Sequence, residues 1–106
     1  MNRGDVCWYK FNTPDKKRPV LILTRDSAIS VLNSVTIAPI TSTIRSIPTE
    51  VVLTEADGLP STCAANFDNL QTVPKSQIGD RITRVSRRKM KEAAAAVSFA
   101  LALSEE

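Results

Sequence analysis

The chain has 106 residues, of which 42% are hydrophobic, 24% charged and 5% aromatic, and its formal net charge is +3. A chain of about 100 residues cannot bury two independent cores, so it is expected to form a single domain over residues 1–106 that dimerisation would help to stabilise. The sequence has no His and only two Cys. It therefore lacks the commonest general base and zinc ligand, and neither a metal nor another cofactor is expected.

The two cysteines and the absence of long apolar segments predict the compartment. Cys7 and Cys63 can form at most one bridge, and buried free thiols in a reducing cytoplasm fit better than a disulfide framework. No stretch approaches the roughly 18 apolar residues that cross a bilayer, and the first residues lack a signal-peptide core. A cytoplasmic protein is expected. Its charge permits nucleic acid as a partner without requiring it.

The first predicted elements are two strands and a helical turn. Residues 5–11 are rich in aromatic and β-favouring side chains, and 19–23 form a short apolar run led by Pro19, so both are predicted to be strands. The segment 12–18 between them is prone to turns and ends in three cations. Asp26 is predicted to cap a helical turn over 27–32.

The middle of the chain predicts further short strands. They cover residues 35–40, 49–53, 63–67, 70–73 and 81–85, with a turn region at 55–60. Pro39 in the first of these restricts it to an edge or a bulge.

A helix is predicted over residues 87–103, with Ser86 as its N-cap. Its apolar residues Met90, Ala94, Val97 and Leu101 recur at spacings of four, three and four, so this stripe should pack on the sheet or on a partner subunit. The predicted architecture is mainly β: six or seven short, strongly bent strands closed by a C-terminal helix.

The first chemical cluster consists of Lys16, Lys17 and Arg18. It can be a solvated loop or a cationic group held over a groove. Arg18 differs from its neighbours because Pro19 restricts the backbone at the mouth of the strand, and a guanidinium held there can bind a phosphate through two parallel hydrogen bonds.

The second cluster consists of Thr41, Ser42 and Thr43, directly after the strand over 35–40 and before Arg45. These hydroxyls can donate to a phosphoryl oxygen as charge builds on it, or they can simply form a strand edge and a turn.

The third cluster comprises the polar side chains Asn66, Asp68, Asn69 and Gln71. They can read base edges or satisfy backbone groups of a loop.

Six cations between residues 81 and 91, with no acid among them, form a further basic cluster. Four lie in the first turns of the predicted helix, where they oppose the helix dipole. An electrostatic patch for nucleic acid or an acidic partner and a solvated face are both open interpretations.

Taken in order, several of these segments resemble the MazF/PemK family of toxin endoribonucleases from bacterial toxin–antitoxin pairs. The matching segments are 3–6, 18–22, 39–42, 47–51 and 68–72, followed by a C-terminal helix that ends in small apolar residues. Each motif is weak alone, but their order and spacing are specific and extend over nearly the whole chain.

The resemblance implies a fold, partners and a reaction. The fold would be an SH3-like small barrel closed by helices, as a homodimer with a groove for single-stranded RNA along the dimer interface. The ribose 2′-hydroxyl would attack the adjacent phosphate without a metal, leaving a cyclic phosphate and a free 5′-hydroxyl. The antitoxin would be a protein with a disordered, acidic segment that folds over the groove.

The resemblance also implies roles for residues. Arg18 would hold phosphate charge and take part in proton transfer, although a guanidinium is no free base and water or substrate can carry the proton. Thr41 would hold the pentavalent transition state. Lys16, Lys17, Ser42, Asp68 and Asn69 are the expected substrate-binding residues. The loop 12–17 is shorter than in many family members and has no Gly, so its gating role is open.

Two other functions remain to be distinguished. A gyrase-poisoning toxin of the CcdB type shares the barrel but acts through a Trp near its C-terminus, whereas the only Trp here is Trp8. A barrel that only binds RNA or protein is the other alternative, and the presence of both Arg18 and Thr41 argues against it.

Overall fold

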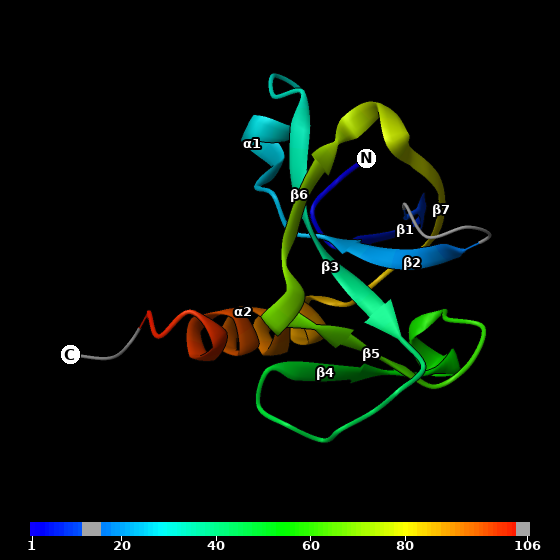
Figure 1. The fold of residues 1–106 in the computed structure, drawn as a ribbon, viewed down its shortest axis with the longest axis vertical. Helices are drawn as coiled ribbons and strands as arrows, with labels where there is room; N and C mark the ends of the chain where they lie inside the picture. The colour runs from blue at the N-terminus through cyan, green and yellow to red at the C-terminus, as the bar shows by residue number, and fades with distance from the viewer. Residues whose placement is uncertain (12–15, 104–106) are drawn as a thin grey trace.

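The fold is a bent β-sheet with a long C-terminal helix beside it (Figure 1). The computed structural model describes residues 1–11 and 16–103. The strands are β1 (Asp5–Lys10), β2 (Lys17–Ile22), β3 (Ser34–Thr41), β4 (Glu50–Leu53), β5 (Cys63–Asn66), β6 (Gln71–Pro74) and β7 (Ile78–Arg84). The helices are α1 (Asp26–Ile29) and α2 (Arg87–Ala100), with 3-10 turns η1 (Glu55–Asp57), η2 (Phe67–Asn69) and η3 (Lys75–Gln77). The mainly β architecture with a C-terminal helix is confirmed.

Strand β3 is the centre of the sheet and joins its two halves. The strand order is β4-β5-β3-β2-β1-β7, and β6 pairs with β3 off this path. β6 pairs with residues 34–37 of β3, and β5 pairs with Ile40 and Thr41. Pro39, expected at an edge or a bulge, instead lies in this interior strand opposite Val20. It falls between the β6 and β5 pairings, where a missing N–H costs least.

Two buried apolar clusters occupy the two faces of the sheet, because successive residues of a strand point to opposite sides. The larger cluster includes Phe67, Leu53 and the inward face of α2. The smaller one draws on β1, β2, β3 and α1, and also on Val73 of β6 and Ile78 of β7. Since β6 and β7 are not paired with each other among the described residues yet share this cluster, the sheet curls around it in the manner of a small barrel.

Helix α2 begins as predicted and ends earlier. The Ser86 side chain accepts a hydrogen bond from Lys89 N at 3.1 Å, which confirms the N-cap. The helix ends at Ala100 rather than at 103. Its core-facing residues are Ala93 and Ala96, with Met90, Val97 and Ala100 packed beside them. Ala94 and Leu101 of the predicted stripe are exposed, so the buried face is rotated from the predicted one.

The first two strands and α1 also differ from the sequence-based prediction. Lys17 and Arg18, expected in a loop, lie in β2, because the hairpin pairing continues through Lys10↔Lys17 and Tyr9↔Arg18. Pro19 is therefore the third residue of its strand, and the predicted loop over 12–18 lies partly outside the described residues.

Asp26 does not cap α1, whose N-cap is Arg25. The Asp26 carboxylate instead accepts a hydrogen bond from the backbone N–H of Arg3 at 2.8 Å.

Cys7 and Cys63 are both buried and unbridged, which confirms the prediction of free thiols. Burial raises the pKa of both thiols, and the neighbouring Asp5 and Asp57 carboxylates act in the same direction. Neither thiol is therefore suited to nucleophilic chemistry. None of the helices in the part of the chain that the structure describes is long and apolar enough to cross a membrane.

Candidate active site

Arg18 and Thr41 lie on two neighbouring strands of the sheet, β2 and β3. Tyr9 and Arg18 are partners in the β1–β2 hairpin. The β2–β3 pairing ends with Val20 opposite Pro39, two residues short of Arg18 on β2 and two residues short of Thr41 on β3. Residues directly opposite each other in antiparallel strands project from the same face. Tyr9, Arg18 and Thr41 therefore share one face, beyond the end of the smaller apolar cluster.

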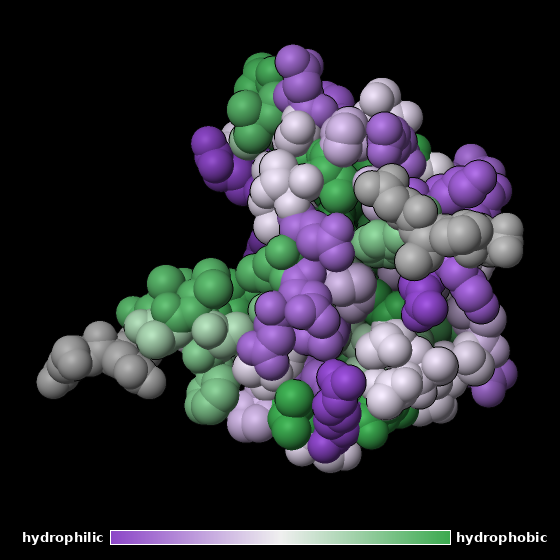
Figure 2. Space-filling model, viewed as in Figure 1, coloured by the Kyte–Doolittle hydropathy of each residue, from purple (hydrophilic) through white to green (hydrophobic). Residues whose placement is uncertain are grey.

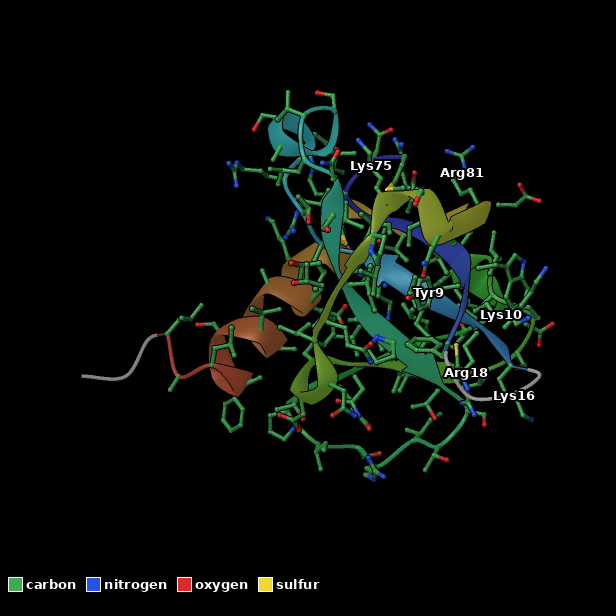
Figure 3. All side chains as sticks on the ribbon, turned by 45° about the horizontal axis from the view of Figure 1, so that its top comes forward. Tyr9, Lys10, Lys16, Arg18, Lys75 and Arg81 are labelled. Carbon is green, nitrogen blue, oxygen red and sulfur yellow. The ribbon has the colours of Figure 1, made fainter. Side chains whose placement is uncertain are left out.

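The Arg18 guanidinium is available to a ligand. Arg18 is exposed, and it forms no ion pair with any acidic residue in the described ranges. Lys16, just before β2, is also exposed, and its carbonyl accepts from the backbone N–H of Phe11 at 3.3 Å. Figure 3 shows Tyr9, Lys10, Lys16 and Arg18 gathered around the β1–β2 hairpin. This end of the sheet is positively charged, as a phosphate-binding site requires.

The Thr41 hydroxyl has a fixed orientation. Its oxygen accepts a hydrogen bond from the backbone N–H of Thr43 at 3.1 Å. An oxygen that already accepts in this way leaves its O–H free to donate elsewhere. Thr41 is the last residue of β3 and is half-buried, whereas Ser42 after it is exposed. Thr41 thus presents a held donor on the face of the sheet that carries Arg18.

The segment 42–49 after Thr41 is tied to β4. The Glu50 Oε1 atom accepts from the backbone N–H of Arg45 at 2.8 Å, and the backbone N–H of Glu50 donates to the carbonyl of Ile47 at 3.0 Å. The second carboxylate oxygen of Glu50 is buried and has no hydrogen-bond partner among the described residues. These hydrogen bonds fix the segment between β3 and β4, and they therefore also fix the backbone that follows Thr41.

Asp68 and Asn69 are not brought beside Arg18. They belong to η2, which packs between β3 and α2. The Asp68 carboxylate accepts from the Thr49 hydroxyl at 2.7 Å, and its backbone N–H donates to the Asn66 side chain at 2.8 Å. Asn66 thus satisfies a loop backbone group, one of the two interpretations left open by the sequence. Asn69 is exposed.

Half of the basic cluster between residues 81 and 91 has internal partners. Arg84 Nε donates to the buried Asp5 carboxylate at 2.9 Å, and an Arg81 nitrogen lies 3.8 Å from the same oxygen. Lys89 Nζ donates to the carbonyl of Val52 at 2.9 Å. Arg81 and Arg84 belong to β7, so of these three cations only Lys89 lies in the first turn of α2. The remaining cations, Arg87, Arg88 and Lys91, are exposed.

Sequence reasoning missed Tyr9, Glu50 and Asp5. Tyr9 was assigned only to a strand, although an aromatic residue on a strand next to cations is a common feature of nucleic-acid surfaces. Asp5 contacts Arg84, 79 residues away in sequence, and no local pattern reveals such a contact, whereas Glu50 contacts the backbone of Arg45 only five residues away. Among the residues that the structure describes, no group of three or more Cys, Asp or Glu side chains is arranged to hold a metal ion.

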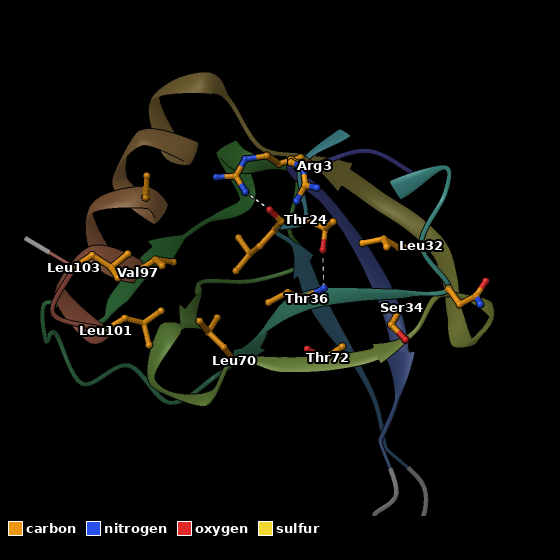
Figure 4. Close-up of a pocket in the computed structure, with 14 residues that line it drawn as sticks. Arg3, Thr24, Leu32, Ser34, Thr36, Leu70, Thr72, Val97, Leu101 and Leu103 are labelled. Carbon is orange, nitrogen blue, oxygen red and sulfur yellow. Dashed lines mark hydrogen bonds between the residues drawn. The ribbon is translucent and has the colours of Figure 1, made fainter. Parts of the chain in front are cut away.

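An apolar groove of about 860 Å³ lies on another side of the molecule, between α2 and β6 (Figure 4). Its apolar lining includes Leu32, Leu70, Val97, Leu101 and Leu103. Leu101 and Leu103 are 55% and 66% exposed. Figure 2 shows apolar side chains gathered over this end of the chain. Such a continuous exposed patch on a small domain indicates a surface that another molecule covers.

Known proteins resemble this chain over nearly its full length. Residues 2–101 match the family described as PemK-like, MazF-like toxin of type II toxin–antitoxin system. The chain is 39% identical over 94 residues to a probable endoribonuclease MazF2 of Mycobacterium tuberculosis (strain CDC 1551 / Oshkosh), which covers 88% of this chain and 90% of that protein.

Solved structures with the same fold are also similar in sequence. Mycobacterium tuberculosis toxin MazF-mt6 superimposes with a TM-score of 0.84 at 35% identity, covering 92% of this chain and 96% of that one. An endoribonuclease in complex with its cognate antitoxin, from Mycobacterial species, superimposes with a TM-score of 0.85 at 28% identity, covering 97% and 96%.

Proposed function

Because the chain belongs to the PemK-like, MazF-like toxins of type II toxin–antitoxin systems, we propose that it is a sequence-specific endoribonuclease that cuts single-stranded RNA without a metal ion. The observation that carries this proposal is that the exposed Arg18 and the oriented hydroxyl of Thr41 project from the same face of the sheet, each two residues beyond the Val20–Pro39 pair. A cation and a fixed donor at one point of a positively charged surface suit a phosphodiester whose charge increases during reaction.

The proposed reaction is an intramolecular transfer. The ribose 2′-oxygen loses its proton and forms a bond to the adjacent phosphorus, and the bond from phosphorus to the 5′-oxygen breaks. The 5′-oxygen takes up a proton, which leaves a cyclic phosphate on one fragment and a 5′-hydroxyl on the other. The nucleophile belongs to the substrate, so the protein has to align it and stabilise charge rather than supply a reacting atom.

Arg18 and Thr41 divide this task. A guanidinium remains protonated at neutral pH and carries several N–H donors in a planar fork, so Arg18 binds two phosphoryl oxygens and neutralises the developing charge. It is a donor rather than the base that removes the 2′-proton, a role that falls to water or a substrate group. Thr41 donates its O–H to a phosphoryl oxygen while Thr43 N–H holds its oxygen in place.

The Thr41 hydroxyl can be tested by removing it while keeping the shape of the side chain. Thr41→Val is expected to lower the single-turnover cleavage rate about 10²-fold, the effect of losing one pre-organised donor to a developing oxyanion. Thr43→Val, which alters an exposed hydroxyl two residues away, serves as the matched control and should cut at nearly the wild-type rate. Equal rates for both variants would remove Thr41 from the mechanism.

We further propose that the active form is a homodimer that uses the apolar groove between α2 and β6. At micromolar concentration the wild type should sediment as a dimer, and Leu101→Glu should sediment as a monomer because it places a charge in a desolvated contact. Ala95→Glu, on an exposed position of α2 outside the groove, is the control. A monomeric wild type would contradict the dimer.

Lys16, Lys17 and Arg18 also offer a binding surface to the cognate antitoxin of such a toxin. We expect its contact segment to be acidic and disordered when free, because exposed cations attract such a chain and can order it on binding. An antitoxin segment seated here would compete with RNA for the same charges, which is how it would neutralise the toxin.

A further inference from the structure

A second, polar pocket lies on the other face of the β1–β2 hairpin from Arg18. It has a volume of about 680 Å³ and is lined by Trp8, Lys10, Lys17 and Asp80. Trp8 and Lys10 alternate with Tyr9 on β1, and Lys17 precedes Arg18 on β2, so the pocket residues point to the opposite face. This volume is within the range of roughly 300–1,000 Å³ that is usual for small-ligand sites.

The positions of the two lysines of this pocket lower the stability of the β1–β2 pair. Lys10 and Lys17 are directly opposite each other in the β1–β2 register. Like charges in that arrangement destabilise an antiparallel pair. Neither lysine forms an ion pair with Asp80 or with any other acid in the described ranges. An anionic group bound between the two ammonium groups would relieve their repulsion.

The pairing of β1 with β7 is irregular at the same point. Cys7 pairs with Arg81 and Tyr9 pairs with Ile78, so two residues of β7, Gly79 and Asp80, oppose the single residue Trp8. This is a β-bulge, a feature that is common beside functional sites and that redirects side chains. Gly79 permits it, because a Cβ there would lie 3.2 Å from the carbonyl oxygen of Trp8. The bulge places Asp80 at the rim of the pocket.

We propose that this pocket is an RNA subsite, in which a nucleobase next to the cleaved bond stacks on the indole ring of Trp8 and the flanking phosphates lie between Lys10 and Lys17. An aromatic ring between cations is the arrangement by which proteins bind single-stranded nucleic acid with little sequence preference. Asp80 can accept a hydrogen bond from an exocyclic amino group of the stacked base. A purely acidic peptide would use the lysines but would leave the indole without a stacking partner.

The geometry of β2 connects this pocket to the proposed cleavage site. Pairing of β2 with β3 begins at Val20, so residues 17–19 have β1 as their one strand neighbour among the described residues. Lys17 and Arg18 are consecutive, so at this free edge one cation faces each side of the hairpin. An RNA strand whose phosphate is bound by Arg18 can pass around the edge, and its next nucleotides can then reach Trp8. The inference thus rests on the proposed function and extends the RNA path.

Trp8 is the only Trp of the chain, so its fluorescence reports on this pocket alone. The probe is a short 2′-O-methyl oligoribonucleotide of mixed sequence, which cannot be cut because it has no free 2′-hydroxyl. Titration is expected to quench the Trp8 emission. Trp8→Leu should weaken binding about tenfold, since stacking contributes about 1–3 kcal/mol per base, and Trp8→Phe should retain most of the affinity.

The lysines are tested through the salt dependence of binding. The double variant Lys10→Gln and Lys17→Gln should lower the slope of log affinity against log salt by about 1.4, because each lost phosphate contact on a single strand accounts for about 0.7. Lys91→Gln, an exposed cation on α2, should leave the slope as it is in the wild type. Circular dichroism and thermal unfolding establish that each variant folds. If Trp8→Leu does not fold, quenching in the wild type and the slope of the lysine variant decide the question.

Two results would overturn the subsite. One is RNA binding that leaves both the Trp8 emission and the affinity of Trp8→Leu unchanged; the other is quenching by poly-glutamate as strong as by RNA, which would assign the pocket to an acidic protein. Cleavage of unmodified RNA is measured in parallel. If the wild type cuts RNA and the Trp8 emission does not change, the subsite is refuted and the proposed function stands. If the wild type binds the methylated probe through Trp8 but cuts no RNA, the proposed function is refuted and the subsite stands.

Discussion

Replacing Arg18 with Ala is expected to lower the rate of RNA cleavage at least about 10²–10³-fold, the cost of removing one strong donor from a developing oxyanion. The reason is that Arg18 is an exposed cation on the same face of the sheet as Thr41, and a truncated side chain leaves the phosphoryl charge without a partner. The measurement is a single-turnover cleavage assay with labelled RNA and enzyme in excess. Arg18→Lys should recover only part of the rate, because an ammonium lacks the planar fork.

The fold should not change in these variants. Arg18 is exposed, so its removal should alter the free energy of unfolding by no more than about 0.5 kcal/mol. Arg88→Ala removes an exposed guanidinium from α2 and should cut at the wild-type rate, which controls for net charge. Full activity in the folded Arg18→Ala variant would refute the assignment of Arg18.

The largest loss of stability is expected for Phe67→Ala, at about 3–5 kcal/mol. Phe67 is 1% exposed and is the largest fully buried side chain of the described core, in η2 between β3 and α2. Its removal leaves a cavity that helix and sheet together cannot close. Urea unfolding measures the loss, and total stabilities of about 5–15 kcal/mol make it a large fraction.

Phe99→Ala is the matched control, because it removes the same ring from a side chain that is 63% exposed. Its expected effect on the unfolding free energy is below about 0.5 kcal/mol. A loss below about 1 kcal/mol for Phe67→Ala would mean that η2 does not anchor α2 to the sheet.

Local patterns were sufficient for the elements and their order. The Ser86 cap, the β-branched runs around β3 and β4 and the turn before β5 depend on neighbouring residues, and they appear where the sequence predicts them. Asp26 shows the limit of such reasoning. Its side chain suits a cap, but a backbone N–H of Arg3, 23 residues away in sequence, provides its partner instead. Contacts between distant segments are not visible in a local pattern.

Residue patterns alone left Arg18 and Thr41 in separate clusters, and only the family resemblance placed them in one site. Arg18 was expected in a loop and Thr41 after a strand, whereas both are strand residues, on the neighbouring strands β2 and β3. The stripe on α2 shows a similar limit of residue patterns. Periodicity identified an apolar helix correctly, but Ala93 rather than Ala94 faces the core, because four consecutive alanines leave the helix rotation undetermined until it packs.

The central claim is that this protein cuts RNA by transfer to the 2′-oxygen without a metal ion. The most direct test incubates the purified wild type with single-stranded RNA in excess EDTA and identifies the new ends by mass spectrometry. The expected products carry a 2′,3′-cyclic phosphate on one side and a 5′-hydroxyl on the other. Intact RNA in EDTA, or products with a 5′-phosphate and a 3′-hydroxyl, would contradict the claim.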